Sequence, residues 1–205
     1  MGVTGSPYLA VLLAVALVRL AELRISRRNQ LILAARGAQK VPEPGFRWMV
    51  AFHAAILVSA GAEVVFWERP FIPLLALCMG LLLACAIGLR WWVIRILAEH
   101  WNVQVMTSAE LGVVTDGPYR WIRHPNYAAV FVELIALPLL HTAWCTALAG
   151  AIVHCFLLRG RIRVEEAILL ANPSYVASMA WKPRFVPRLF PSSWKPARER
   201  LAPKP

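Results

Sequence analysis

Polar residues that could bind a ligand or take part in a reaction gather in two segments, 99–127 and 159–175, of a mainly apolar chain. In the first, a Gly-Pro pair at 117–118 predicts a turn, and Pro125 disfavours helix at the preceding His124. A non-helical segment at membrane depth is tolerated only where protein covers it or where it lines a polar cavity. We therefore expect a pocket against this loop.

The second segment carries Arg161, Glu165 and Glu166. Arg161 and Glu165 are four residues apart and so share one face if the segment is helical. One interpretation is an ordinary ion pair beside the membrane, which contributes less than about 1 kcal/mol when exposed. The other is a functional site, favoured because the whole chain has only 11 acidic residues.

The composition points to lipid. Of 205 residues, 59% are hydrophobic and 16% charged, whereas a soluble domain carries about a quarter charged residues. This excludes disorder, a coiled coil and a disulfide-stapled module. The four cysteines lie in apolar runs without zinc-site spacing, so we expect core residues and no metal.

Long apolar runs predict an all-α integral membrane protein, since about 20 apolar residues cross a bilayer as helix. From Tyr127 to Leu158 the run is broken near Pro138, which indicates a hairpin of two short helices of uncertain depth. With that hairpin the chain has about five membrane helices, the first three at 7–23, 47–67 and 71–97.

Basic residues predict the orientation and explain the net charge of +11. Six lie in 24–47 and ten in 159–205, whereas the link at 68–70 has one. We therefore expect the N-terminus outside, with the C-terminus and the active site cytoplasmic. The charge then faces anionic lipid of the bilayer rather than nucleic acid.

Three regions follow from this organisation. Residues 1–97 are N-terminal membrane helices, interrupted at 24–47 by a basic segment that is either an amphipathic interfacial helix over 25–37 or a solvated connector. Residues 98–185 form the candidate catalytic core. Residues 186–205 are a Pro-rich basic tail, expected to be a surface strap or a disordered end.

Several polar residues fall inside the predicted spans, where they are costly in lipid and so face the bundle interior. His53 and His154 are interpreted mainly as hydrogen-bond partners between helices, and Glu63 is expected to face the bundle interior. Glu133 could close the floor of the pocket or tie to a neighbouring helix. Arg90 is expected to anchor the third span at the interface.

The run from Gly117 to Tyr127, followed by Arg161-Ile-Arg-Val-Glu165-Glu166, resembles the isoprenylcysteine carboxyl methyltransferase family over roughly 88–185. The resemblance implies a helical membrane enzyme that uses S-adenosylmethionine, with a cytoplasmic pocket formed by the 99–127 loop and the C-terminal segment. It implies Arg161, Glu165 and Glu166 as catalytic residues. The implied cofactor contacts include a strand-like run at 111–114, and they are Gln104, Leu111, Gly112, Val113, Val114, Tyr119, His124, Pro125, Asn126, Tyr127 and Glu165.

Two positions depart from the family pattern: Leu111, where a His is common, and Ala129, where a Gly is common. The resemblance implies O-methylation of a lipophilic acceptor, either a prenylcysteine-type carboxylate or the hydroxyl of a long-chain phenolic or pyrone lipid. Two alternatives stay open. These are an NADPH-dependent sterol-type membrane reductase, which resembles this family in its C-terminal core, and a non-catalytic membrane scaffold.

Overall fold

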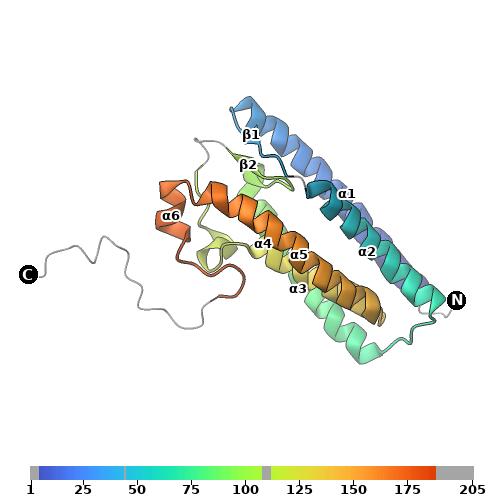
Figure 1. Cartoon of the computed structure of the whole chain (residues 1–205). Helices are drawn as coiled ribbons and strands as arrows, with labels where there is room; N and C mark the ends of the chain where they lie inside the picture. Colours follow the sequence, from blue (N-terminus) through green and yellow to red (C-terminus); the bar gives the residue numbers. More distant parts are fainter. Residues whose placement is uncertain (1–4, 44, 108–111, 188–205) are drawn as a thin grey trace, which may run out of the picture.

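The computed structural model describes residues 5–43, 45–107 and 112–187, and its architecture is a bundle of helices (Figure 1). Residues 188–205, most of the predicted tail, lie outside this part. The described chain confirms a mainly helical fold. Its helices are α1 (Gly5–Ala35), α2 (Phe46–Phe66), α3 (Pro73–Leu97), α4 (Pro125–Leu139), α5 (Trp144–Leu169) and α6 (Pro173–Met179), with 3-10 turns η1 (Ala98–His100) and η2 (Gly117–Arg120) and an antiparallel ribbon of β1 (Gln39–Lys40) and β2 (Met106–Thr107).

Three described helical stretches are long and apolar enough to cross a membrane: Phe46–Phe66, Pro73–His100 and Trp144–Leu169. The chain is thus an integral membrane protein, although these spans are fewer than the five expected. α4 is a shorter apolar helix of 15 residues. α5 has 26 residues, so the prediction of a short second hairpin arm is wrong. It continues past Leu158 because Arg and Glu are good helix formers.

α1 corrects a second expectation. It is one helix of 31 residues, in place of a membrane span followed by a separate interfacial helix or connector. No proline or glycine interrupts the chain between residues 8 and 36, so nothing stops the helix at the membrane boundary. The helix ends next to Gly37, which has φ of 82° and whose amide donates to the carbonyl of Ala34 at 3.0 Å.

Small residues let the helices approach closely. A Cβ added to Gly150 of α5 would lie 2.7 Å from Ile56 Cδ1 of α2, and one added to Gly61 of α2 would lie 3.2 Å from Leu9 Cδ2 of α1. Such close packing drives helix association in lipid, where apolar burial adds little.

The four cysteines are exposed on the outer surface, so their assignment to the core is wrong.

Glu63 joins α2 to the start of α5, at the end of the bundle that carries the 68–70 link. Its carboxylate accepts hydrogen bonds from the amide and hydroxyl of Thr146, both at 2.7 Å, and pairs with Arg69 at 2.8 Å. A carboxylate at a helix N-terminus satisfies free amides and complements the helix dipole. The inward orientation expected for Glu63 is therefore confirmed.

Candidate functional site

The two polar segments meet where α4 and α5 emerge toward the ribbon of β1 and β2. Arg161 Nε donates to the Tyr127 hydroxyl at 2.7 Å, and that hydroxyl donates in turn to Glu165 Oε2. Arg161 and Glu165 do share one face of α5, but Tyr127 of α4 stands between them. The simple ion pair is thus replaced by a three-residue chain of polar groups, which we name the Arg161 site.

Glu43, in the connector between α1 and α2, completes this site. Its Oε2 lies 3.1 Å from Arg161 Nη1, and both side chains are more than nine-tenths buried. Its Oε1 accepts from the amide of Val105 at 2.6 Å. A buried guanidinium is stabilised only when its charge is paired, and Glu43 supplies that charge.

The backbone around Gln104 is fixed from both sides. The carbonyl of Val103 accepts a hydrogen bond from Arg161 Nη2 at 2.6 Å, and the amide of Val103 donates to Ser26 Oγ of α1 at 3.0 Å. Val105 is held by Glu43 as described. Gln104 is half-buried between these two anchors. These contacts hold the backbone of Gln104 beside the Arg161 site, and its role as a cofactor contact stays a prediction.

A groove of about 300 Å³ opens from the Arg161 site between α2 and α5. Arg161 and Glu43 form its polar end, and its walls are mainly apolar. One wall residue, Phe156, is 70% exposed on the surface of a membrane-spanning helix. The groove therefore connects the buried guanidinium with the lipid-facing surface, and its other wall residues are Gly45, Phe46, Met49, Leu157, Gly160 and Val164.

Glu166 forms a second cluster one residue farther along α5. Its Oε1 lies 3.1 Å from both His124 Nε2 and Arg123 Nη1, and its Oε2 lies 2.5 Å from Arg184 Nη2. The ring of His124 stacks on that of Tyr127, with centroids 5.3 Å apart. The Glu166 cluster thus supports one wall of the Arg161 site.

The segment 182–185, which we call the strap, lies across the loop that precedes α4. The amides of Arg123 and His124 donate to the carbonyls of Pro183 and Arg184, each at 2.9 Å. Lys182 Nζ donates to the carbonyl of Tyr119 at 2.7 Å, and burial lowers the pKa of Lys182. The hydrogen bond to Glu166 raises the pKa of Arg184. This strap precedes the predicted tail at 186–205, most of which lies outside the described residues, so the surface strap or disordered end expected of the tail stays a prediction.

Replacing Arg184 with alanine tests what the strap holds. The variant loses both hydrogen bonds from Arg184 to Glu166, and a bond to a charged group contributes about 1.5 kcal/mol. We expect the amides of Arg123 and His124 to exchange about 10-fold faster with deuterium, because the strap opens more often. An exposed arginine, Arg163, provides the matched control. Unchanged protection in Arg184→Ala would contradict this role.

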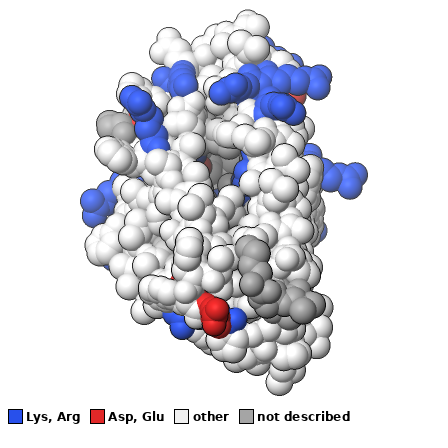
Figure 2. All heavy atoms as spheres, turned by 90° about the vertical axis from the view of Figure 1, so that its right-hand side faces the viewer, with Lys and Arg blue, Asp and Glu red and all other residues white. Residues whose placement is uncertain are grey.

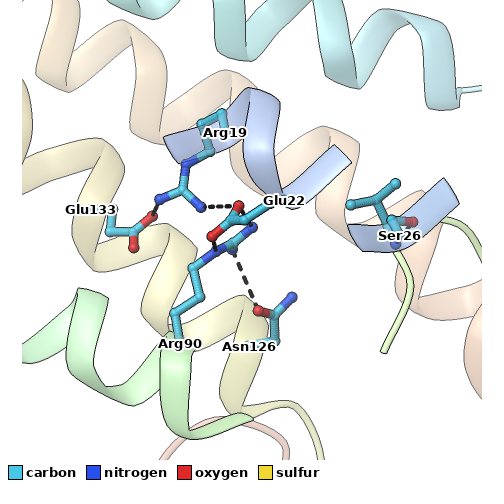
Figure 3. A network of polar contacts seen from close by, with 7 residues as sticks. Arg19, Glu22, Ser26, Arg90, Asn126 and Glu133 are labelled. Atoms are coloured by element: carbon cyan, nitrogen blue, oxygen red, sulfur yellow. Dashed lines mark hydrogen bonds and ion pairs between the residues drawn. The ribbon is translucent and has the colours of Figure 1, made fainter. Parts of the chain in front are cut away.

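A third network lies inside the bundle between α1, α3 and α4 (Figure 3). Arg90 makes two hydrogen bonds of 2.8 Å to Glu22, and Arg19 bridges Glu22 and Glu133 at 2.6 Å to each. Arg90 Nη1 also lies 3.4 Å from Asn126 Oδ1, next to Tyr127. Arg90 is buried, so its expected role as an interface anchor is wrong, and Glu133 ties to a neighbouring helix.

The structure confirms some predictions for the remaining residues and corrects others. Pro125 begins α4 after His124, as expected, and the Gly117-Pro118 turn forms η2 with Gly117 at φ of 56°. Residues 112–115 have no regular structure, which corrects the strand-like interpretation of Gly112, Val113 and Val114. Leu111 lies outside the described residues. No group of three potential metal ligands occurs among the residues that are described.

Sequence reasoning missed Glu43, Arg19 and Glu22. Glu43 is the sole acidic residue in the basic segment 24–47, a signal that could have marked it as a partner for a buried cation. Arg19 and Glu22 are three residues apart near the end of an apolar run, where unpaired charges are costly. That cost could have indicated a network inside the membrane.

A solved structure, of the eukaryotic intramembrane Ras methyltransferase ICMT (isoprenylcysteine carboxyl methyltransferase), matches with a TM-score of 0.50 and 23% identity. The match covers 65% of this chain and 48% of the other, so the chain spans about half the length of that enzyme. At this identity the likeness concerns the fold.

Two bacterial relatives cover most of the chain. The uncharacterized protein YpbQ of Bacillus subtilis is 30% identical over 160 residues, which are 78% of this chain and 95% of YpbQ. An uncharacterized protein of Haemophilus influenzae is 29% identical over 74% of this chain and 88% of its own length. The model of the isoprenylcysteine carboxyl methyltransferase (ICMT) family matches residues 77–171, which include the Arg161–Tyr127–Glu165 contacts. The chain belongs to the isoprenylcysteine carboxyl methyltransferase family.

Proposed function

We propose that the protein is an S-adenosylmethionine-dependent O-methyltransferase whose lipophilic acceptor enters from the bilayer. The observation that carries this proposal is the groove between α2 and α5, which joins a membrane-facing apolar surface to the buried Arg161 guanidinium. Such a groove suits an amphiphile with a polar reactive end and an apolar tail. A scaffold protein has no need for a paired guanidinium at the end of an apolar groove.

Arg161 has donors left for the acceptor. Of its five N–H groups, one is directed at Tyr127, one at the carbonyl of Val103 and one at Glu43. One N–H remains on each terminal nitrogen. Nη1 also lies 3.7 Å from the sulfur of Met49, a weak acceptor on the groove wall. An anionic acceptor oxygen can displace that contact and be oriented by two parallel hydrogen bonds.

The residues around the site fit the proposed cofactor. When bound, S-adenosylmethionine would supply an electrophilic sulfonium methyl group to the acceptor oxygen. Glu165 offers a carboxylate to a cationic amino group or a ribose, and Tyr127 offers an aromatic face. On the adjoining loop, Trp101 Nε1 and Asn102 Oδ1 are buried without hydrogen-bond partners among the described residues. A buried donor and acceptor of this kind suit a polar ligand such as a nucleoside.

The chain's own groups also bear on proton transfer. A carboxylate acceptor is ionised near neutral pH and requires no base. Burial raises the pKa of Tyr119 well above its usual value and that of Tyr175 to about 12, so neither side chain is a phenolate near neutral pH. Glu166 is held by three cationic or imidazole groups. We therefore assign Glu166 to positioning the loop, and Arg161 and Glu165 to substrate and cofactor.

The proposed orientation puts this site on the cytoplasmic face. Arg161 contacts Glu43 in the basic 24–47 segment, and the strap residues Lys182 and Arg184 lie beside it. On the face shown in Figure 2, most Lys and Arg side chains lie in the upper half, and few charged side chains lie below them. Basic residues concentrate on the cytoplasmic side of membrane proteins.

Calorimetry of the full chain in detergent tests the cofactor. We expect S-adenosylhomocysteine to bind and NADPH not to bind. Binding of NADPH alone would instead support a reductase of the sterol type, and binding of neither would support a scaffold. A matched pair of variants sharpens the result: Glu165→Gln should weaken S-adenosylhomocysteine binding about 10-fold by removing a charged hydrogen-bond acceptor, whereas Glu99→Gln, at an exposed ion pair, should leave it unchanged.

A further inference from the structure

A second pocket, of about 420 Å³, lies between the later half of α1 and the ribbon of β1 and β2, which are neighbours in Figure 1. It shares no lining residue with the groove at Arg161. Its lining combines two cations and an amide with apolar side chains, and no described lining residue is acidic. The polar ones are Arg27, Gln30 and Lys40, and the apolar ones include Leu31, Ala34 and Met106.

The cations of this pocket lack a counter-charge within the described structure. Segment 24–47 carries six basic residues and a single acidic one, which pairs with the buried Arg161. Of those six, Arg36 alone has an ion pair among the residues that the structure describes. Arg27 and Lys40 are exposed, so their charges are free to attract an anion from outside the protein.

The pocket lies at the level where membrane-spanning helices end. Asn29, which lies on α1 between pocket residues 27 and 30, donates to the carbonyls of Ala98 and Trp101 at 3.0 and 2.7 Å. Those two carbonyls lie at the end of the apolar stretch Pro73–His100. A second span, α2, begins six residues after β1 ends. Lipid head groups border the ends of such spans, and the basic residues favour the cytoplasmic leaflet, which carries anionic lipid.

The wall of the pocket distinguishes a lipid from a free phosphate ion. Arg27, Leu31 and Ala34 follow one another at helical spacing, so they form one stripe of α1. Leu31 is 75% exposed directly beside the cation. An inorganic phosphate in the pocket would leave this leucine in water, whereas a phospholipid covers it with its glycerol and upper acyl carbons.

We infer that this pocket binds the head group of an anionic phospholipid from the surrounding bilayer. Arg27 and Lys40 pair with the phosphate, and Leu31 and Ala34 contact the apolar part of the same lipid molecule. The site is separate from the proposed methyl-transfer site and does not depend on that function. It differs from general attraction of a basic surface to lipid because one molecule occupies one pocket.

A lipid in this pocket also stabilises the ribbon. Lys40 of β1 is the register partner of Met106 of β2, and both line the pocket. Beside them, the amide of Val41 donates to the carbonyl of Val105 at 3.0 Å. A ligand that binds only the closed ribbon reduces its opening, so we expect the Val41 amide to exchange several-fold more slowly with deuterium when the lipid is bound.

The test measures lipid binding to the full chain in detergent by native mass spectrometry, which counts the bound molecules. Dioleoyl phosphatidylglycerol is compared with dioleoyl phosphatidylcholine. We expect one phosphatidylglycerol to bind about 10-fold more tightly, an effect of the size that one or two basic side chains produce at an anionic surface. The double variant Arg27→Gln with Lys40→Gln should lose this preference and the slower exchange of Val41.

Arg24→Gln with Arg28→Gln is the matched control, because it removes the same charge from exposed positions of α1 that do not line the pocket. It should keep the preference. Equal affinities for the two lipids, or a preference that survives the pocket variant, would overturn the inference. An equal loss in the control would show diffuse attraction in place of a site, and unchanged exchange at Val41 would place the lipid elsewhere. Soluble glycerol phosphate that binds as tightly as phosphatidylglycerol would show a free-phosphate site and overturn the lipid assignment.

Discussion

Arg161→Lys is expected to lower kcat for methyl transfer by about 100-fold, the cost of a reacting group misplaced by about 1 Å. Arg161 is directed at Tyr127, Val103 and Glu43 at once, and these contacts leave two N–H groups for the acceptor. A lysine keeps the charge but has a single nitrogen, so it cannot hold those partners and an anion in a planar arrangement. The measurement is transfer of a labelled methyl group from S-adenosylmethionine to membrane lipids, with identification of the product.

Two comparisons separate this role from general damage. Arg163→Lys changes an exposed arginine on the same helix and should leave the rate unaltered. S-adenosylhomocysteine should bind Arg161→Lys within a few-fold of the unaltered protein, because Arg161 is assigned to the acceptor. Undiminished turnover in Arg161→Lys would remove Arg161 from the proposed site, and a parallel loss of S-adenosylhomocysteine binding would reassign it to the cofactor.

Glu22→Gln should lower the free energy of unfolding by about 3–5 kcal/mol, the usual cost of removing one partner from a buried ion pair. Glu22 is 2% exposed and is paired with both Arg90 and Arg19. Without it, Arg19 still pairs with Glu133, whereas Arg90 loses the carboxylate that it contacts (Figure 3). Reversible unfolding in mixed micelles measures the change.

A charge-balanced double variant provides the sharper test. Glu22→Gln with Arg90→Gln removes one charge of each sign, so part of the lost stability should return, and the two substitutions should not be additive. Glu99→Gln is the control, since its ion pair with Arg36 is about half exposed and contributes at most about 1 kcal/mol. A loss in Glu22→Gln no larger than in Glu99→Gln would show that the buried network does not stabilise the fold.

Local signals in the sequence predicted the parts of the structure that depend on local chemistry. The apolar runs at 47–67 and 71–97 became α2 and α3 nearly as expected. Pro125 began a helix, and Gly117 and Gly37 adopted the positive φ that turns and helix ends favour. These outcomes depend on backbone sterics and hydropathy, which a single sequence carries.

Contacts between segments far apart in the sequence could not be predicted from such local signals. Tyr127 was predicted to bind the cofactor and Arg161 the acceptor, but nothing in either segment indicated that one hydroxyl joins Arg161 to Glu165. Glu43 is 118 positions from its partner Arg161 in the sequence. The continuous helix α1 was missed because the basic residues from Arg24 onward were taken as the end of the first span, whereas Arg24, Arg27 and Arg28 lie exposed on the same helix.

Because Glu43 pairs with Arg161, the stretch that the family model matches depends on residues outside it. The family model matches residues 77–171, yet the carboxylate that neutralises Arg161 and the serine that holds the Val103 amide both come from outside that stretch. The matched core therefore does not contain all the groups that form the Arg161 site. A chimera that transplants it between relatives without residues 19–43 would lack the carboxylate that contacts Arg161 directly, and a working exchange must move both parts together.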